Sequence, residues 1–248
     1  MSDKQISVEI CIDSMESADN AVAGGADRLE VCSALPLGGL TPSVGFVSTL
    51  NCKYPSMPLH CMIRSRPGNF VYSQDEMQVH LEDIEWLKKA GAHGFVFGAL
   101  TENGSIDRDA CESVIETARP LPVTFHRAID VAFDWKSCLE EAIELGFKAV
   151  LTSGQEPTAL DGVHVIRKMQ EEYSGQIDVL VGCGVNSSNV ANLVEWTRCQ
   201  WYHASASVVK NKVINKVSMG QKDNQPLRIT SPKEVHEIKA TLAFKIDQ

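Results

Sequence analysis

Short apolar runs alternate along this chain with longer stretches in which apolar residues recur at helical spacing. Runs such as Phe95-Val96-Phe97 and Val179-Leu180-Val181 are apolar on both faces, which is typical of strands buried in a parallel sheet. We predict strands over 6–12, 27–33, 58–64, 93–98, 121–126, 148–152, 177–182 and 201–205. We predict helices over 14–24, 43–51, 74–90, 107–118, 134–145, 158–173, 187–197 and 231–243.

Eight strands alternating with eight helices predict an α/β fold, a (β/α)8 TIM-like barrel that forms a single domain over 1–248. An open doubly wound sheet is the alternative, and the even spacing of the units favours closure. The last helix has a start signature, with Ser231 as N-cap, Pro232 at the first position and Glu234 at the third. Before it, we expect an irregular stretch at about 208–229, either a solvated loop or a lid.

The composition narrows the class of protein. The chain has 248 residues, 44% of them hydrophobic, and a formal net charge of −9. This acidic balance argues against nucleic-acid and membrane-surface binding, because both need a basic patch. The sequence shows neither a signal peptide nor an apolar run of membrane-spanning length, so we expect a cytoplasmic protein, with the nucleus as a second location. Its eight cysteines are then expected to be reduced thiols.

Two copies of one short pattern stand near the N-terminus, Val8-Glu9-Ile10-Cys11 and Leu29-Glu30-Val31-Cys32. Because side chains alternate along a strand, each Glu shares a face with its Cys. The helical stretch between the copies predicts a βαβ unit, whose two strands are parallel neighbours about 5 Å apart. Two carboxylates and two thiols are thus expected together at the carboxyl ends of adjacent strands, where barrels bind ligands.

Other strand ends also carry polar side chains. Arg64 ends the third strand, where it either holds a carboxylate or phosphate or neutralises Glu9 or Glu30. His126, followed by Arg127, ends the fifth strand, a suitable place for acid–base chemistry. Further candidates for ligand binding follow the sixth and seventh strands, namely Thr152, Ser153, Gly182 and Gly184. His203 lacks charged neighbours in the sequence, but it stays a residue of interest because it ends the eighth strand.

Several ordered motifs resemble the CutC copper homeostasis family over nearly the whole chain. They are Leu29-Glu30-Val31-Cys32, Gly38-Gly39-Leu40-Thr41-Pro42-Ser43, Met62-Ile63-Arg64, Thr124-Phe125-His126-Arg127 and Leu151-Thr152-Ser153-Gly154. The resemblance implies a cytoplasmic TIM-like barrel, often a homo-oligomer, that binds copper through two cysteines falling on Cys11 and Cys32. The chain departs from the family pattern at Ser65, where Pro is usual, and at Ile129, where Phe is usual.

Two functional hypotheses follow. In the first, the protein binds Cu(I), a soft ion suited to thiolates, through Cys11 and Cys32 at the barrel mouth. In the second, it is an enzyme acting on a small phosphorylated or carboxylated metabolite. Protons would be moved by Glu9, Glu30 and His126, and the anion would be held by Arg64, Arg127 and the loops after the last strands. Both hypotheses expect one cavity faced by Glu9, Cys11, Glu30, Cys32, Arg64 and His126.

Overall fold

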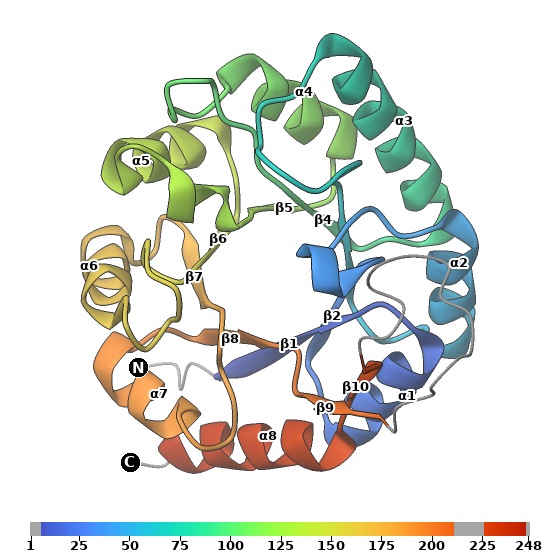
Figure 1. Ribbon diagram of the computed structural model, residues 1–248, viewed down its shortest axis with the longest axis vertical. Helices are drawn as coiled ribbons and strands as arrows, with labels where there is room; N and C mark the ends of the chain where they lie inside the picture. The colour runs from blue at the N-terminus through green and yellow to red at the C-terminus, as the bar shows by residue number, and fades with distance from the viewer. Residues whose placement is uncertain (1–5, 211–225, 247–248) are drawn as a thin grey trace.

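Eight parallel strands close into a barrel in the computed structural model, which describes residues 6–210 and 226–246 (Figure 1). The strands follow one another in chain order, and the last strand pairs with the first. They are β1 (Ser7–Ile12), β2 (Arg28–Val31), β3 (Leu59–Met62), β4 (Gly94–Phe97), β5 (Val123–Phe125), β6 (Ala149–Thr152), β7 (Asp178–Val181) and β8 (Trp201–Ala204). The predicted TIM-like barrel is therefore confirmed, and the open sheet is not what forms.

The eight predicted helices form an outer ring around the strands (Figure 1). They are α1 (Met15–Gly24), α2 (Val44–Lys53), α3 (Gln74–Ala90), α4 (Arg108–Ala118), α5 (Trp135–Leu145), α6 (Val163–Tyr173), α7 (Val190–Thr197) and α8 (Pro232–Ile246). Helix α6 begins five residues later than predicted, because Thr158 and Asp161 bond to each other in a preceding turn. Two short 3-10 helices also form, η1 (Leu35–Leu37) and η2 (Arg127–Val131).

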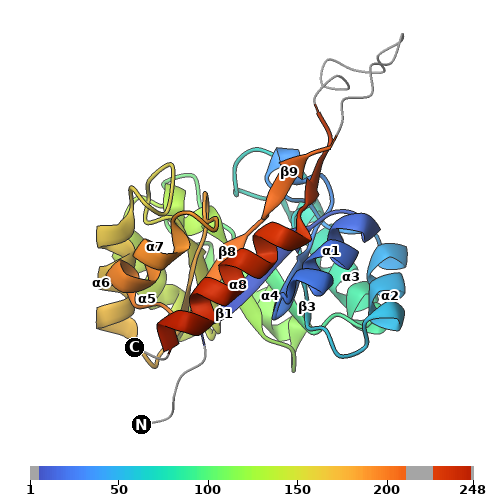
Figure 2. The same cartoon turned by 90° about the horizontal axis from the view of Figure 1, so that it is seen from below.

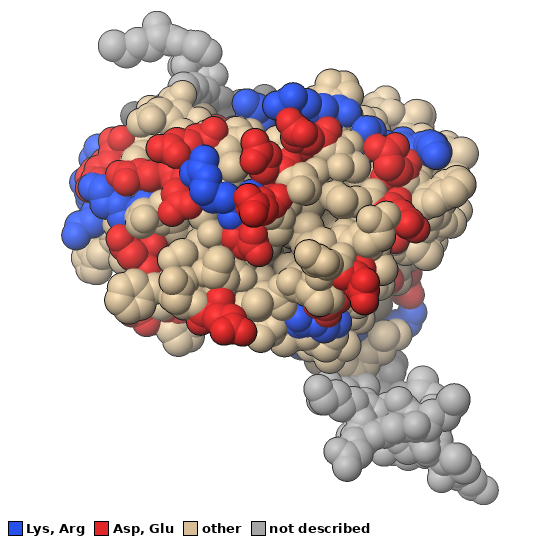
Figure 3. Space-filling model, turned by 90° about the horizontal axis from the view of Figure 1, so that it is seen from above, with Lys and Arg blue, Asp and Glu red and all other residues tan. Residues whose placement is uncertain are grey.

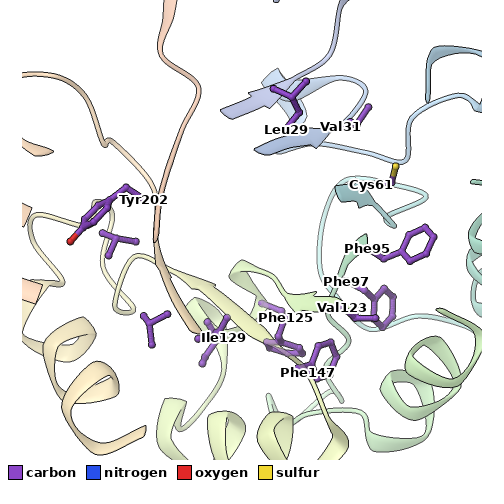
Figure 4. Packing of buried hydrophobic residues seen from close by; sticks show 14 of the residues in the cluster. Leu29, Val31, Cys61, Phe95, Phe97, Val123, Phe125, Ile129, Phe147 and Tyr202 are labelled. Carbon is purple, nitrogen blue, oxygen red and sulfur yellow. The ribbon is translucent and has the colours of Figure 1, made fainter. Parts of the chain in front are cut away.

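Alternation along the strands separates an apolar layer from a polar interior. Val8, Ile10 and Ile12 of β1 are fully buried in the cluster between the barrel and the helices. The same layer holds the aromatic side chains of β4 and β5, together with Cys61 of β3 (Figure 4). Glu9 and Cys11 therefore point the other way, toward the barrel axis, as the alternation predicts.

The ends of the predicted irregular stretch are regular. Strands β9 (Ser207–Val209) and β10 (Arg228–Thr230) pair antiparallel, and β9 leads away from the barrel (Figure 2). The prediction of one irregular loop over 208–229 is therefore wrong at both ends, and residues 211–225 lie outside the described part of the chain. Sequence alone could not reveal a pairing between segments about twenty residues apart.

The start of α8 has only half of the predicted capping arrangement. The Glu234 backbone N–H donates to Ser231 Oγ at 3.3 Å, which confirms Ser231 as the cap. The Glu234 carboxylate instead accepts hydrogen bonds from the backbone N–H and the hydroxyl of Ser187, at 2.7 and 3.0 Å. Glu234 thereby ties α8 to the loop after β7.

The surface mixes charges of both signs. On the face shown in Figure 3, Asp and Glu side chains lie interspersed with Lys and Arg side chains. Within the described ranges, none of the helices combines the length and the apolar character that crossing a bilayer requires.

Candidate functional site

Three potential metal ligands meet inside the barrel where its first and last strands pair. One ligand atom each from Cys11 on β1, Glu30 on β2 and His203 on β8 lie within 4.8 Å of one another. The sheet register explains this meeting, because Cys11 lies beside Glu30 and Glu9 lies beside His203. All three residues are buried, each with 9% or less of its surface exposed, and Oε1 of Glu30 has no hydrogen-bond partner within the described structure.

The Glu9 carboxylate lies behind these three residues and fixes the position of His203. Its Oε1 lies 2.7 Å from Nδ1 of His203, and its Oε2 accepts a hydrogen bond from Nε of Arg28 at 2.5 Å. The Arg28 guanidinium also stacks on the Trp201 ring, 4.1 Å from its centroid. Burial opposes the charge of Glu9, but Arg28 and then His203 hold the pKa of Glu9 well below its usual range.

His203 lies between two carboxylates. Its Nδ1 faces Glu9, and its Nε2 lies 3.7 Å from Oε2 of Glu30. Burial disfavours a charged imidazole, but Glu30, Cys11 and Glu9 together raise the pKa of His203 well above its usual value. Burial raises the pKa of Glu30, and repulsion from Glu9 acts in the same direction. His203 therefore carries the positive charge of the group when no metal is bound.

Cys32 is adjacent to this group but more deeply enclosed. Its thiol donates to Oε2 of Glu30 at 3.5 Å, and its side chain is fully buried. Gly39 covers the sulfur from the loop after β2, with a positive φ of 83° that favours glycine, and a Cβ there would lie 3.1 Å from Cys32 Sγ, a tight contact. Burial, followed by the charge of Glu30, raises the pKa of the Cys32 thiol well above its usual value.

A cavity of about 480 Å³ opens above these residues at the carboxyl ends of the strands. Four of the six residues expected to face one cavity line it, namely Cys11, Glu30, Arg64 and His126. Glu9 and Cys32 also point inward, but they lie behind the lining. Within the described residues, Arg64 forms no ion pair. Arg28 and His203 contact the Glu9 carboxylate instead, so they perform the neutralisation of Glu9 that was one of the roles considered for Arg64.

The polar residues after β5 and β6 form a network around Asp130. The Asp130 carboxylate accepts from the Thr152 hydroxyl at 2.6 Å, from the Ser153 backbone N–H at 3.0 Å and from Nε of Arg127 at 2.8 Å. Arg127 lines the cavity, whereas Thr152 and Ser153 are fully buried and do not. The geometry thus makes Thr152 and Ser153 supports for Arg127, not direct contacts for a ligand in this cavity.

The two glycines after β7 differ in their surroundings. Gly184 lines the cavity with a positive φ of 79°. Gly182 lies lower and does not line the cavity, and a Cβ there would come within 2.5 Å of Leu151 Cδ1 inside the barrel. Only Gly184 is therefore placed to contact a ligand in this cavity.

His126 owes its position to Gly98 at the end of β4. A Cβ on Gly98 would lie 2.6 Å from Nδ1 of His126. We expect Gly98→Ala to displace the imidazole and to lower the free energy of unfolding by about 1–3 kcal/mol, the usual cost of overpacking. Urea denaturation would measure this. Gly45→Ala is the matched control, because nothing lies within 4 Å of its Cβ and alanine favours the helix α2. Equal stability of the two variants would contradict the steric explanation.

His203 and Arg28 were not among the predicted site residues, although His203 was of interest for its place at the end of the eighth strand. The strand register places both residues beside Glu9, Arg28 through the pairing of β1 with β2 and His203 through the pairing of β8 with β1 at the seam of the barrel. Closure of the predicted barrel was the available signal, because it makes the last strand a neighbour of the first. Barrel closure together with the alternation of side chains along each strand would have predicted that His203 points inward and lies beside Glu9.

Comparisons with known proteins agree with this fold. The model of the CutC family matches residues 6–208. A Caenorhabditis elegans protein described as a copper homeostasis protein cutC homolog is 74% identical over 243 residues, covering 98% of this chain and 97% of that protein. A human homolog with the same description is 40% identical over 240 residues, covering 94% of this chain and 88% of that protein.

Solved structures have the same barrel fold. The putative copper homeostasis protein CutC from Streptococcus agalactiae superposes with a TM-score of 0.77 at 29% identity, covering 81% of this chain and 99% of that one. Thiamine phosphate pyrophosphorylase from Pyrococcus furiosus superposes with a TM-score of 0.60 at 15% identity, covering 98% of both chains, a likeness of fold alone.

Proposed function

Because this chain belongs to the CutC family of copper homeostasis proteins, we propose that it binds Cu(I) at the seam of its barrel. The observation that carries this proposal is the group formed by Cys11, Glu30 and His203, whose ligand atoms lie within 4.8 Å of one another. The Cys32 thiol, bonded to Glu30, supplies a second sulfur at the same place. Sulfur and imidazole nitrogen are donors that suit Cu(I), whereas Mg²⁺ and Ca²⁺ prefer oxygen.

His203 has the arrangement typical of metal-binding histidines. Glu9 fixes its Nδ1 at 2.7 Å and leaves Nε2 directed toward Glu30. A carboxylate behind a ligating histidine sets the ring orientation and makes the free nitrogen a better ligand. The unpartnered oxygen of Glu30 and the positive charge of a bound ion would balance each other in this buried setting. Thiol and imidazole protons are displaced when the metal binds.

Cu(I) titration against a chromophoric chelator tests the proposal on reduced, metal-free protein. We expect Cys11→Ser to weaken binding roughly 100-fold, and His203→Gln roughly 10- to 100-fold, since ligand loss costs at least as much as loss of a supporting partner. Cys32→Ser is expected to weaken binding and to remove one sulfur from the X-ray absorption spectrum. Excess Mg²⁺ or Ca²⁺ should not compete.

Cys52→Ser is the matched control, because Cys52 is an exposed thiol on α2, away from the cavity. This variant should bind Cu(I) as the unmodified protein does. Circular dichroism would verify that each variant is folded. Unchanged stoichiometry and affinity in the combined Cys11→Ser and Cys32→Ser variant would place the ligands elsewhere, with Cys183 at the cavity lining as the next candidate.

The alternative hypothesis, an enzyme that uses acid–base chemistry, has weaker support than copper binding. Of its three proposed proton carriers, Glu30 and His126 line the cavity, while Glu9 is engaged by Arg28 and His203. The part of that hypothesis that gains support is the binding of an anion, because the cavity contains a cationic group that copper binding does not use.

A further inference from the structure

Arg64 places an unbalanced positive charge in the cavity. Its side chain follows β3 and is only 7% exposed. One terminal nitrogen donates to the carbonyl oxygens of Leu37 at 3.1 Å and Gly39 at 3.3 Å, and the other donates to Gly68 at 3.0 Å. These bonds fix the plane of the guanidinium but bring no negative charge, and Arg64 is absent from the ion pairs of the described residues. A buried cation without an anion is costly, which points to a missing partner.

His126 adds an unused hydrogen-bond donor. It lines the same cavity and is only 3% exposed. Its Nδ1 accepts a hydrogen bond from the Ala128 backbone N–H at 3.2 Å, so the proton of the neutral ring resides on Nε2. This Nε2 is buried and has no partner within the described part of the protein. Burial, followed by the charge of Arg64, lowers the pKa of His126 to about 3, which keeps the ring neutral.

Phe70 connects these two groups. The Arg64 guanidinium lies over the Phe70 ring, 5.2 Å from its centroid, and the His126 ring centroid lies 4.7 Å from that of Phe70. The three side chains therefore form one wall of the cavity, between the ends of β3 and β5. Arg127 lines the cavity from the loop that follows His126, although Asp130 balances its charge.

The opposite side of the cavity has a different character. Glu234 lines it from the N-terminal turn of α8, beside the loop after β7. That carboxylate disfavours an anion beside the loop after β7, although the Arg228 side chain of β10 also lines the cavity. The cavity of about 480 Å³ is also far larger than one metal ion requires and falls in the range of small-molecule sites.

We propose that Arg64 and His126 bind the oxyanion group, phosphate or carboxylate, of a small organic molecule that occupies this cavity. The guanidinium supplies the charge, and the His126 Nε2–H supplies a directional hydrogen bond. The site is distinct from Cys11 and Cys32 and does not require copper, so it is a second binding function of the same cavity.

Titration of reduced, metal-free protein with inorganic phosphate, glycerol 3-phosphate and succinate tests this proposal. We expect at least one probe to bind and to raise the melting temperature as its concentration increases. Arg64→Gln should weaken that binding roughly 10- to 100-fold, the usual value of a hydrogen bond to a charged group. His126→Asn should also weaken it, although asparagine can still accept the bond from Ala128. Arg167→Gln, on the exposed face of α6, is the matched control and should bind normally.

The probes also distinguish the two oxyanions. Binding of both phosphates without succinate identifies a phosphate site, and the reverse identifies a carboxylate site. The proposal would be overturned if no probe binds the folded protein, or if Arg64→Gln and His126→Asn both bind as the unmodified protein does. Cys11→Ser should leave oxyanion binding unchanged, so a failure of the copper proposal and a failure of this one give separate results.

Discussion

Lowering the pH from 6.5 to 4 is expected to unfold this protein, because three histidines are buried in their neutral form. Burial is the main cause that lowers the pKa of His60 and His80 to about 4 and that of His126 to about 3, from an ordinary value of 6.5. Below pH 6.5 the unfolded chain binds protons that the folded chain does not. Stability is therefore complete above pH 6.5 and is lost as the pH falls toward the lowered pKa values.

The magnitude is comparable to the whole stability of a domain. At about 1.36 kcal/mol per pKa unit, each histidine accounts for about 3 kcal/mol at pH 4, and the three for about 9 kcal/mol. A typical domain has about 5–15 kcal/mol in total. Glu30, whose pKa burial raises, opposes the trend, because its neutral form is favoured in the folded state. His203, whose pKa is raised, opposes the trend as well, whereas the lowered pKa of Glu9 acts in the same direction as the three histidines.

Circular dichroism followed against pH would measure this transition. His80→Gln should shift it to lower pH, because the glutamine oxygen can still accept the Ser65 N–H bond that His80 accepts at 3.1 Å, but no longer takes up a proton. His236→Gln, on the exposed side of α8, is the control and should leave the transition in place. A chain that remains folded at pH 4, with the same profile in both variants, would show that these rings are not held neutral.

Replacing Glu9 with alanine is expected to lower the free energy of unfolding by about 3–5 kcal/mol, because two buried cationic groups lose their common anion. Glu9 is 1% exposed and contacts Arg28 at 2.5 Å and His203 at 2.7 Å. The side chains of both partners are only 11% exposed, so most of their surface stays away from water when Glu9 is removed. Removing one member of a buried charged network costs more than its net contribution, since the remaining charges stay desolvated.

Urea denaturation at pH 7 would measure this loss. The surface pair of Lys136 and Glu172, 2.8 Å apart, offers a control of the same chemistry. Glu172→Ala should cost no more than about 1 kcal/mol, as exposed ion pairs do. Similar unfolding midpoints for Glu9→Ala and Glu172→Ala would show that the network below the site does not hold Arg28 and His203.

The periodicity of apolar residues was sufficient to predict the strands and helices and to predict which side chains of a strand share a face. Every predicted strand overlaps an observed one, because fully buried strands require apolar residues on both faces. The doublet placed Glu9, Cys11, Glu30 and Cys32 on the correct side, because alternation in a strand depends only on backbone geometry.

Features of the site that depend on tertiary contacts could not be predicted from periodicity. Arg64 binds carbonyl oxygens of two loops, and no local pattern encodes such a contact. The burial of Cys32 beneath Gly39 depends on the path of the loop after β2. Likewise, β9 and β10 contain β-branched residues, but each strand has only 3 residues, too few for an alternating pattern to be recognised.

The pairing of β1 with β8 also determines the stage of synthesis and folding at which the group of Cys11, Glu30 and His203 can form. Cys11 and His203 are separated by nearly the whole chain, and only the pairing of the first and last strands brings them together. During synthesis, the two cysteines leave the ribosome long before His203 does. A nascent or truncated chain that ends before β8 therefore lacks the imidazole that completes the group of Cys11, Glu30 and His203. If this group binds Cu(I) as we propose, the chain can bind the ion there only after translation has delivered the last strand and the barrel has closed.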